Sequence, residues 1–277
     1  MDLHLSGKRV LVTGASRGIG LAIVRAFEAE GAEVVAVSRR STPELEATGA
    51  VFVAADLSAP DGPRRMVETV LAAGPRLDVL VNNAGSPSQL GSIEEVDAQA
   101  FRATQEVNVM GALYGIKHAA GHLRRQGTGG SIINIASITG DRVVYAGVAY
   151  SVSKAALVNL TKWAAAELGR HDIRVNSIAP GFITTARFGK AAGVTEEQAQ
   201  DRLNALADYA RERAKSMQAI PRPGFGSDVT GAAVYLAGDA SSYMTGQNLV
   251  IDGGLSRGQP LEAMVAIRDD MARIYLG

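Results

Sequence analysis

Short apolar runs alternate with longer segments of helical pattern along the chain. A run such as Val34–Val37 is rich in valine and too short for a helix, so it predicts a buried parallel strand. Segments such as Ile19–Glu30 and Val152–Leu168 carry apolar residues at spacings of three and four, as one face of a helix does. Seven strands are predicted on this basis, at Val10–Val12, Val34–Val37, Val51–Val53, Val79–Val81, Ile132–Ile135, Val175–Ile178 and Leu249–Ile251.

Regular alternation of strand and helix predicts an α/β fold. We expect a Rossmann-like, doubly wound, seven-stranded parallel sheet with helices on both faces. No linker, repeat or low-complexity tract divides the chain, so residues 1–277 should form a single domain. Two segments fall outside the rhythm: a long charged stretch at about 186–220 and a C-terminal extension, 255–277.

Composition and charge narrow the possible functions. Acidic and basic residues balance at 28 each, which argues against a nucleic-acid partner. The chain has no cysteine, so disulfides and thiolate metal sites are excluded. The N-terminus lacks a signal-peptide pattern and no apolar run is long enough to span a bilayer, so we expect a cytoplasmic protein without membrane contact. His118 and His122 stand four apart without a further ligand, so no metal is expected.

A glycine-rich turn, Thr13-Gly14-Ala15-Ser16-Arg17-Gly18-Ile19-Gly20, follows the first strand and precedes a helix. Glycine lets the backbone approach a phosphate closely, and a helix N-terminus offers N–H groups and positive dipole. A glycine triplet alone could be an ordinary tight turn, but this context is typical of dinucleotide binding. The residues expected to contact the dinucleotide here are Gly14, Ser16, Arg17, Gly18, Ile19 and Gly20.

The end of the second strand bears on the choice of cofactor. NAD-binding versions of this fold usually place an acidic residue there, which accepts hydrogen bonds from the ribose hydroxyls and repels a 2′-phosphate. Here that position is Ser38, and the next residue, Arg39, can stack on adenine and meet a phosphate. Arg17 brings a second cation to the same place. The sequence therefore predicts NADP(H), with NAD(H) less favoured.

Tyr150 and Lys154 are four residues apart and lie on one face of a predicted helix. A nearby cation favours the phenolate, as a general acid/base near neutral pH requires. On its own, this spacing favours an ordinary pair on a helix face. Further motifs support chemistry, because they follow strands whose carboxyl ends form the ligand crevice of such sheets: Asn82-Asn83-Ala84-Gly85, Ser137, Pro180-Gly181-Phe182-Ile183-Thr184-Thr185 and Asp252-Gly253-Gly254.

On these motifs, the sequence from about Leu5 to Gly254 resembles the short-chain dehydrogenase/reductase family, in its compact single-domain branch. The resemblance implies that Tyr150 donates the proton in reduction and accepts it in oxidation. It implies that Lys154 binds the nicotinamide ribose and that Ser137 holds the substrate oxygen. Asn108, in the helix after the fourth strand, should keep a water that links Lys154 to solvent.

The resemblance also implies the remaining cofactor contacts. Asn83, Ala84 and Gly85 should line the adenosine side, and Asp56, with Leu57, should contact the adenine. The nicotinamide end should meet Pro180, Gly181, Ile183 and Thr185, beside Tyr150 and Lys154. One departure lies in Ile220–Gly226, where the family usually carries an arginine a few residues after the first proline. Here Gly224 stands at that place and Arg222 is out of register.

The charged stretch predicts a substrate lid. Thr195 and Gln198 have capping-box spacing, and a helix should run from Glu196 to about Met217. Its apolar side would carry Leu203, Leu206, Ala210 and Met217. We expect this side to close a fairly hydrophobic pocket lined by Ser137, Tyr145, Tyr150, Phe182 and Phe188; the alternative is a plain surface helical pair.

The motifs together predict an NADP(H)-dependent oxidoreductase that moves a hydride between the nicotinamide and a carbonyl or secondary alcohol of a small, fairly hydrophobic substrate. A ketoreductase of general or secondary metabolism leads, and a 3-oxoacyl thioester reductase, acting on carrier-protein or CoA-linked groups, is the alternative. A non-catalytic NADP(H)-sensing binder is the alternative from a different class. Relatives are commonly tetramers built on the helices that include Tyr150–Gly169 and Thr104–Gln126, so a homotetramer is expected.

Overall fold

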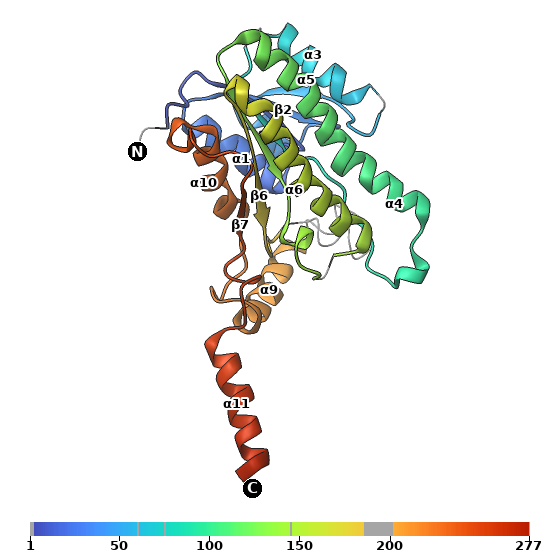
Figure 1. The fold of residues 1–277 in the computed structure, drawn as a ribbon, viewed down its shortest axis with the longest axis vertical. Coiled ribbons are helices and arrows are strands. Elements are labelled where there is room, and N and C mark those ends of the chain that lie inside the picture. The colour runs from blue at the N-terminus through green and yellow to red at the C-terminus, as the bar shows by residue number, and fades with distance from the viewer. Residues whose placement is uncertain (1–2, 60, 75, 145, 186–201, 277) are drawn as a thin grey trace.

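The seven predicted strands are confirmed in the computed structural model, which describes residues 3–59, 61–74, 76–144, 146–185 and 202–276. They form one parallel sheet in the order β3-β2-β1-β4-β5-β6-β7 (Figure 1). From β1 the next strands are added on one side as far as β3, and from β4 they are added on the other side as far as β7. The point between β1 and β4, where the strand order reverses, is where this class of fold binds its ligands. The strands are β1 (Arg9–Thr13), β2 (Glu33–Ser38), β3 (Val51–Ala54), β4 (Val79–Asn82), β5 (Gly130–Ile135), β6 (Ile173–Pro180) and β7 (Asn248–Ile251).

Helices cover both faces of this sheet, as predicted for a doubly wound fold. One face packs against α1 and α10, and the other against α3, α5 and α6. Short turns join these elements, among them η1 (Ile93–Glu95), η4 (Gly169–His171) and η5 (Asp239–Ser241). The helices are α1 (Gly18–Ala29), α2 (Pro43–Glu46), α3 (Gly62–Ala72), α4 (Ala98–Gln105), α5 (Gly111–Gln126), α6 (Val148–Leu168), α9 (Leu203–Met217), α10 (Gly226–Ala237) and α11 (Leu261–Leu276).

Strand residues alternate between the two cores. In β1, Val10 and Val12 join the core under α1 and α10, whereas Leu11 joins the core under α3, α5 and α6. All three side chains are fully buried. Because both faces of the central strands are covered, Val10–Val12 of β1 and Val79–Val81 of β4 form continuous apolar runs instead of alternating with polar residues.

The two segments outside the alternating pattern are both partly helical. Helix α9 ends at Met217, as predicted, and it turns Ala210 and Ala214 inward. The first part of the predicted lid helix, with Thr195 and Gln198, lies outside the described residues. Helix α11 occupies most of the C-terminal extension and projects away from the body (Figure 1). None of the helices in the described part of the chain has the length and apolarity that crossing a bilayer requires.

Candidate active site

The glycine-rich turn is built by close backbone approaches. A Cβ on Gly20 would lie 2.2 Å from the carbonyl oxygen of Gly14, and a Cβ on Gly14 would lie 2.8 Å from Cα of Ala84. Gly14 and Gly18 also have positive φ angles, of 64° and 57°. The turn therefore requires glycine for both space and conformation. It leads into α1, whose N-terminus has no side-chain cap among the described residues.

Asn83, which follows β4, holds this turn in place through hydrogen bonds. Its side-chain NH₂ donates to the carbonyl oxygens of Thr13 (2.9 Å) and Gly14 (3.0 Å). The Thr13 hydroxyl in turn accepts from the backbone N–H groups of Asn83 and Ala84, both at 3.0 Å. The predicted adenosine-side residues thus lie directly against the glycine turn, and the Asn83 amide holds the turn's shape.

Ser38 and Arg39 lie at the carboxyl end of β2, beside the glycine turn. The Ser38 hydroxyl donates to the carbonyl of Arg40 at 2.6 Å, which shapes this corner. Arg39 is exposed, and its charge reaches Asp56 after β3. The pKa of Asp56 is lowered, mainly by hydrogen bonds from the hydroxyl and backbone N–H of Ser58 and further by Arg39. Asp56 therefore stays ionised at neutral pH, with Arg39 as a neighbouring cation.

Tyr150 and Lys154 lie in the first turns of α6, as predicted. The Lys154 side chain is 2% exposed, its Nζ donates to the Ile135 carbonyl at 2.6 Å, and it stands 5.5 Å from the centroid of the Tyr150 ring. At this distance the Lys154 ammonium is in cation–π range of the Tyr150 ring. The structure therefore brings together the two residues on which the acid/base prediction rests.

A buried polar chain fixes α6 against the sheet. The side-chain NH₂ of Asn82 donates to Oδ1 of Asn134, and the side-chain NH₂ of Asn134 donates to the Thr161 hydroxyl, both at 2.9 Å. All three residues are buried, so each bond forms at low dielectric and fixes the position of α6. Since Thr161 is two helical turns after Lys154, these hydrogen bonds position the helix that carries the predicted catalytic pair.

Ser137 comes from the end of β5 and begins the short turn η3 (Ile138–Gly140). Its Oγ accepts from the Thr139 N–H at 3.2 Å, which leaves its own hydroxyl hydrogen able to donate to a substrate oxygen. Gly140 places this turn against α6, because a Cβ there would lie 2.9 Å from the carbonyl of Lys154. Ser137 is thereby held on the same wall as Lys154.

Asn108 lies in a π-helical turn, η2 (Glu106–Met110), between α4 and α5. The prediction placed it in an ordinary helix; the π turn is a local widening of the kind often found at functional sites. Its Oδ1 accepts from the Ser86 N–H at 2.6 Å, and its Nδ2 donates to the Ser86 carbonyl and the Ser153 hydroxyl. Ser86 and Ser153 were not singled out from the sequence, although Ser153 lies within the Tyr150–Lys154 interval.

The nicotinamide-end segment runs past β6 and pairs with the loop before α10. Ile183 and Gly224 form a parallel bridge, and a Cβ on Gly224 would lie 2.4 Å from Cδ1 of Ile183. A side chain at Gly224 would therefore have to displace the end of the Ile183 side chain. Arg222 instead pairs with Asp228 of α10 through two bonds of 2.8 Å, and this pair lowers the pKa of the Asp228 carboxyl.

These residues fit a bound dinucleotide. The glycine cradle leaves backbone N–H groups at the N-terminus of α1 for a pyrophosphate. Within the described part of the chain, the buried hydroxyls of Ser41 and Thr184 have no hydrogen-bond partner, one after Arg40 and one beside Ile183. Buried polar atoms of this kind ordinarily have partners, so these two hydroxyls, in the segments that follow β2 and β6, are groups that a ligand could satisfy.

Two predicted substrate residues, Tyr145 and Phe188, lie outside the described residues, while Phe182 is half-buried beside the Ile183 bridge. His122 bonds to Gln126 at 3.2 Å, and the described residues contain no group of three His, Asp or Glu suited to a metal.

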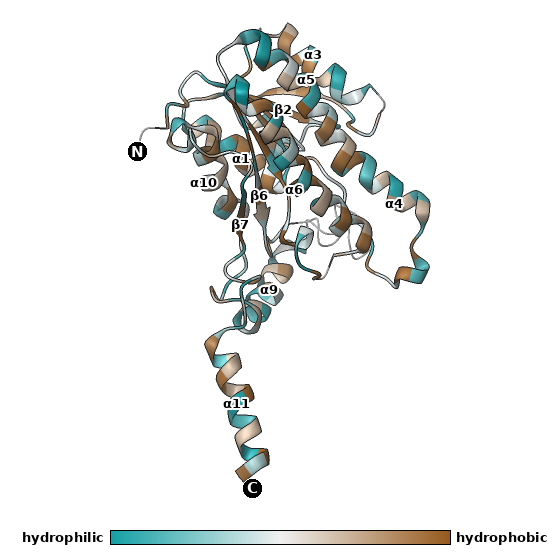
Figure 2. Ribbon diagram, viewed as in Figure 1, coloured by the Kyte–Doolittle hydropathy of each residue, from teal (hydrophilic) through white to brown (hydrophobic). Residues whose placement is uncertain are grey.

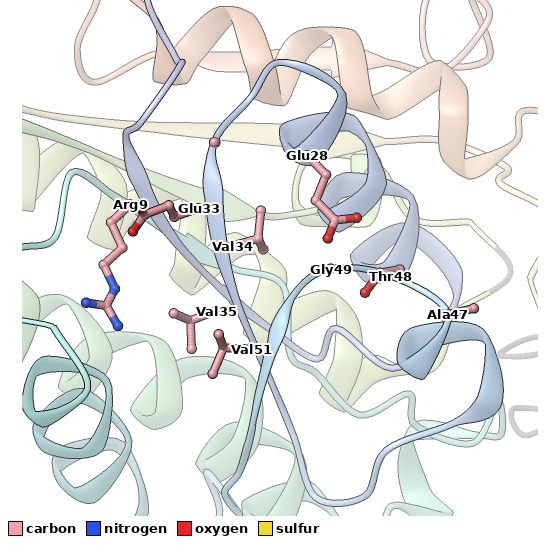
Figure 3. Close-up of a pocket in the computed structure, with 10 residues that line it drawn as sticks. Arg9, Glu28, Glu33, Val34, Val35, Ala47, Thr48, Gly49 and Val51 are labelled. Carbon is pink, nitrogen blue, oxygen red and sulfur yellow. The ribbon is translucent and has the colours of Figure 1, made fainter.

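A hollow of about 590 Å³ lies at the opposite, amino ends of β1 to β3, lined by Arg9, Glu28 and Val51 among others (Figure 3). It contains none of the predicted site residues.

Comparison with known proteins identifies the family. A family model described as enoyl-(acyl carrier protein) reductase matches residues 14–256. L-fucose dehydrogenase of Oryctolagus cuniculus is 38% identical over 91% of this chain and 86% of its own length. Two solved structures are also similar. L-sorbose reductase from Gluconobacter frateurii, complexed with NADPH and L-sorbose, has a TM-score of 0.82 and 33% identity, over 93% of this chain and 100% of its own. Ligand-free aldohexose dehydrogenase from Thermoplasma acidophilum has a TM-score of 0.82 and 31% identity, over 94% of this chain and 98% of its own.

The match covers the glycine turn and all four predicted catalytic residues. The chain belongs to the short-chain dehydrogenase/reductase family, and it is an oxidoreductase of that family.

Proposed function

We propose that this protein is an NADP(H)-dependent oxidoreductase that transfers a hydride between the nicotinamide and a carbonyl or secondary alcohol of a small substrate. The observation that carries the proposal is the placement of Tyr150 and Lys154 on one face of α6, with Ser137 on the adjoining wall. All three residues are present, which disfavours a protein that only senses the cofactor.

The residues divide the chemistry among themselves. When bound, the nicotinamide supplies or accepts the hydride. Ser137 donates its hydroxyl hydrogen to the substrate oxygen and polarises the carbonyl. Tyr150 gives the proton to that oxygen in reduction and takes it back in oxidation, and the Lys154 ammonium stabilises the phenolate left behind. Asn108, held by Ser86 and Ser153, keeps the polar path that resupplies the proton.

NADP(H) is the proposed cofactor because the end of β2 carries Ser38 and Arg39 and no carboxylate. The nearby acid, Asp56, follows β3 instead of β2. It therefore does not occupy the position at the end of β2 where NAD-binding folds place the carboxylate that holds the ribose hydroxyls. The NADPH in the L-sorbose reductase complex supports the same assignment. An exposed guanidinium such as Arg39 suits a 2′-phosphate that enters from solvent.

The substrate class is a small ketone or secondary alcohol. The relatives named above are named for sugars, which contain a carbonyl carbon and secondary alcohols, and the half-buried Phe182 adds an apolar surface. A 3-oxoacyl thioester is the second candidate, because the matching family model is described by a carrier-linked acyl substrate. The lid proposed over this pocket would use the inward side of α9, where Ala210 and Ala214 are buried and Leu206 is half-buried.

A homotetramer is the proposed assembly. The outer face of α6 exposes Trp163 (73%) and Val152 (44%), large apolar side chains of the kind that interfaces cover. Helix α5 is the other element expected in that interface. A sedimentation mass near that of a single 28.9 kDa chain at micromolar concentration would contradict this assembly.

A substrate panel tests the proposed function. Purified protein is assayed with NADPH and with NADH against L-sorbose, apolar ketones and 3-oxoacyl thioesters, and with NADP and NAD against L-fucose and simple secondary alcohols. We expect substrate-dependent cofactor turnover with at least one ketone or secondary alcohol, and faster with the phosphorylated cofactor. Turnover with thioesters alone would favour the second candidate. Cofactor binding without turnover across the panel would favour a sensor.

A further inference from the structure

Helix α11 is an addition to a domain that is already complete. The family match ends at residue 256, and α11 begins at Leu261, after the last strand of the sheet. None of its residues is buried, and it projects beyond the body with apolar patches along its length (Figure 2). Its side-chain ion pairs, Arg268 with Asp269 and Arg273 with Asp270, stay within the helix.

An isolated helix of this length is unfavourable in water. Helices shorter than about 12–15 residues are marginal even in alanine-rich sequences, and α11, with 16 residues, is little longer. Leu261, Ile274 and Leu276 are 67%, 81% and 86% exposed, so the helix also presents large apolar side chains to solvent. A partner that covers these side chains would stabilise the helix.

The apolar positions of α11 define the geometry of that partner. Met264, Ile267, Met271 and Ile274 follow spacings of three, four and three residues, which is a seven-residue repeat. We call these four residues the α11 seam. Each is 49% exposed or more. A seam with this repeat packs against another helix with a matching seam, as in a coiled coil, and Ala266 lies on the side away from it.

Two other partners fit α11 less well. An anionic lipid surface attracts helices rich in Lys and Arg on the polar face, whereas α11 carries Glu262, Asp269 and Asp270 against Arg268 and Arg273. The body of the same chain is also unsuitable, because α11 points away from it (Figure 1).

We propose that α11 pairs with α11 of a second copy of this chain, in parallel orientation, through the α11 seam. With Met264 and Ile267 as the a and d positions, Arg268 is an e position and Asp270 a g position. Antiparallel pairing over the same seam would face Arg268 with its own counterpart and Asp270 with its own counterpart. Parallel pairing faces Arg268 with Ala263, and Asp270 with Tyr275, so it avoids both like-charge contacts. This pairing goes beyond the proposed enzymatic function and does not depend on it.

The absence of cysteine from the chain allows a clean cross-linking test in the full-length protein. In a parallel pair, Met264→Cys meets its own counterpart and forms a disulfide between chains under mild oxidation. In an antiparallel pair, the two residues at this position are about 15 Å apart along the axis and cannot join. Ala266→Cys, on the outward side, is the matched control. We expect at least tenfold more cross-linked dimer from Met264→Cys than from Ala266→Cys, and equal yields would overturn the proposal.

A second measurement separates helix pairing from docking of α11 elsewhere on a neighbouring subunit. Ile267→Asp places a charge in the seam and Ala266→Asp places it on the outward side. By sedimentation, Ile267→Asp should raise the dissociation constant of the assembly at least tenfold, while Ala266→Asp should leave it unchanged. Unchanged association of Ile267→Asp would refute the pairing. Dissociation by Ile267→Asp without a Met264→Cys cross-link would also refute it, by placing α11 against another surface of the partner.

Discussion

Replacing Ser38 with Asp and Arg39 with Leu should transfer the enzyme's preference from NADP(H) toward NAD(H). The change removes a cation from the predicted 2′-phosphate position and creates the carboxylate that NAD-binding folds use to hold the ribose hydroxyls. Both residues lie at the carboxyl end of β2, and Arg39 is exposed, so the fold has little reason to change.

The size of the effect follows from the exposure of this corner. A charge-assisted hydrogen bond contributes roughly 1.5–3 kcal/mol, and the lower end applies to Arg39 because solvent and the nearby Asp56 weaken its field. That is about tenfold in kcat/KM for NADPH. A carboxylate at residue 38 close to a phosphate would add roughly 1–4 kcal/mol of repulsion, depending on the local dielectric. Together, the two substitutions should change the NADPH/NADH ratio of kcat/KM by about 100-fold or more.

The assay is initial-rate kinetics with both cofactors at low and high salt. In the wild type, the advantage of NADPH should shrink as salt screens the exposed phosphate contact, and in the double variant this salt dependence should be lost. Arg170→Leu, which removes an exposed charge from η4, before the amino end of β6, is the control and should leave the ratio unchanged. A wild-type enzyme with a higher kcat/KM for NADH than for NADPH would refute the reasoning, since neither Arg39 nor Arg17 could then reach the phosphate.

Two further substitutions test the cradle and the lid. Gly20→Ala forces a Cβ to within 2.2 Å of the Gly14 carbonyl oxygen, so NADPH affinity by fluorescence titration should fall by at least tenfold. Gly121→Ala is the control and should keep that affinity, because a Cβ there would meet the flexible end of Arg125 at 3.6 Å. Leu206→Asp on the inward side of α9 should raise KM for the substrate far more than KM for the cofactor. The control, Arg211→Asp on the outward side, should change neither KM. Equal increases in both KM values for Leu206→Asp would indicate general destabilisation instead.

The sheet could be predicted from sequence because its central strands are buried on both faces. Runs such as Val10–Val12 are apolar throughout, and their spacing between helical segments leaves few topologies open. The site followed from the same logic, because residues after strand ends, such as Ser137, meet at one edge of the sheet. The spacing of Tyr150 and Lys154 predicted that they share one helix face, but only the motifs after the strand ends made that pair a catalytic candidate.

Other features depend on tertiary contacts that no local pattern reveals. The π turn around Asn108 widens a helix whose sequence looks regular, and it is held by Ser86 from a distant loop. The out-of-register Arg222 is explained only by its pairing with Asp228 and by the side chain of Ile183, which fills the space at Gly224. Helix α11 has a seven-residue apolar repeat. A repeat of two heptads does not by itself tell a helix that packs on its own domain from one that projects away from it.

The most direct test of the account is the turnover of Tyr150→Phe with the best ketone from the substrate panel and NADPH. The substitution removes the phenol oxygen and leaves the ring, so cofactor binding should persist. Turnover should fall by roughly a hundred- to ten-thousand-fold, the contribution of positioned acid–base catalysis. If chemistry limits the rate and Tyr150→Phe keeps more than about a tenth of wild-type turnover, Tyr150 is not the proton donor and the proposed mechanism is wrong.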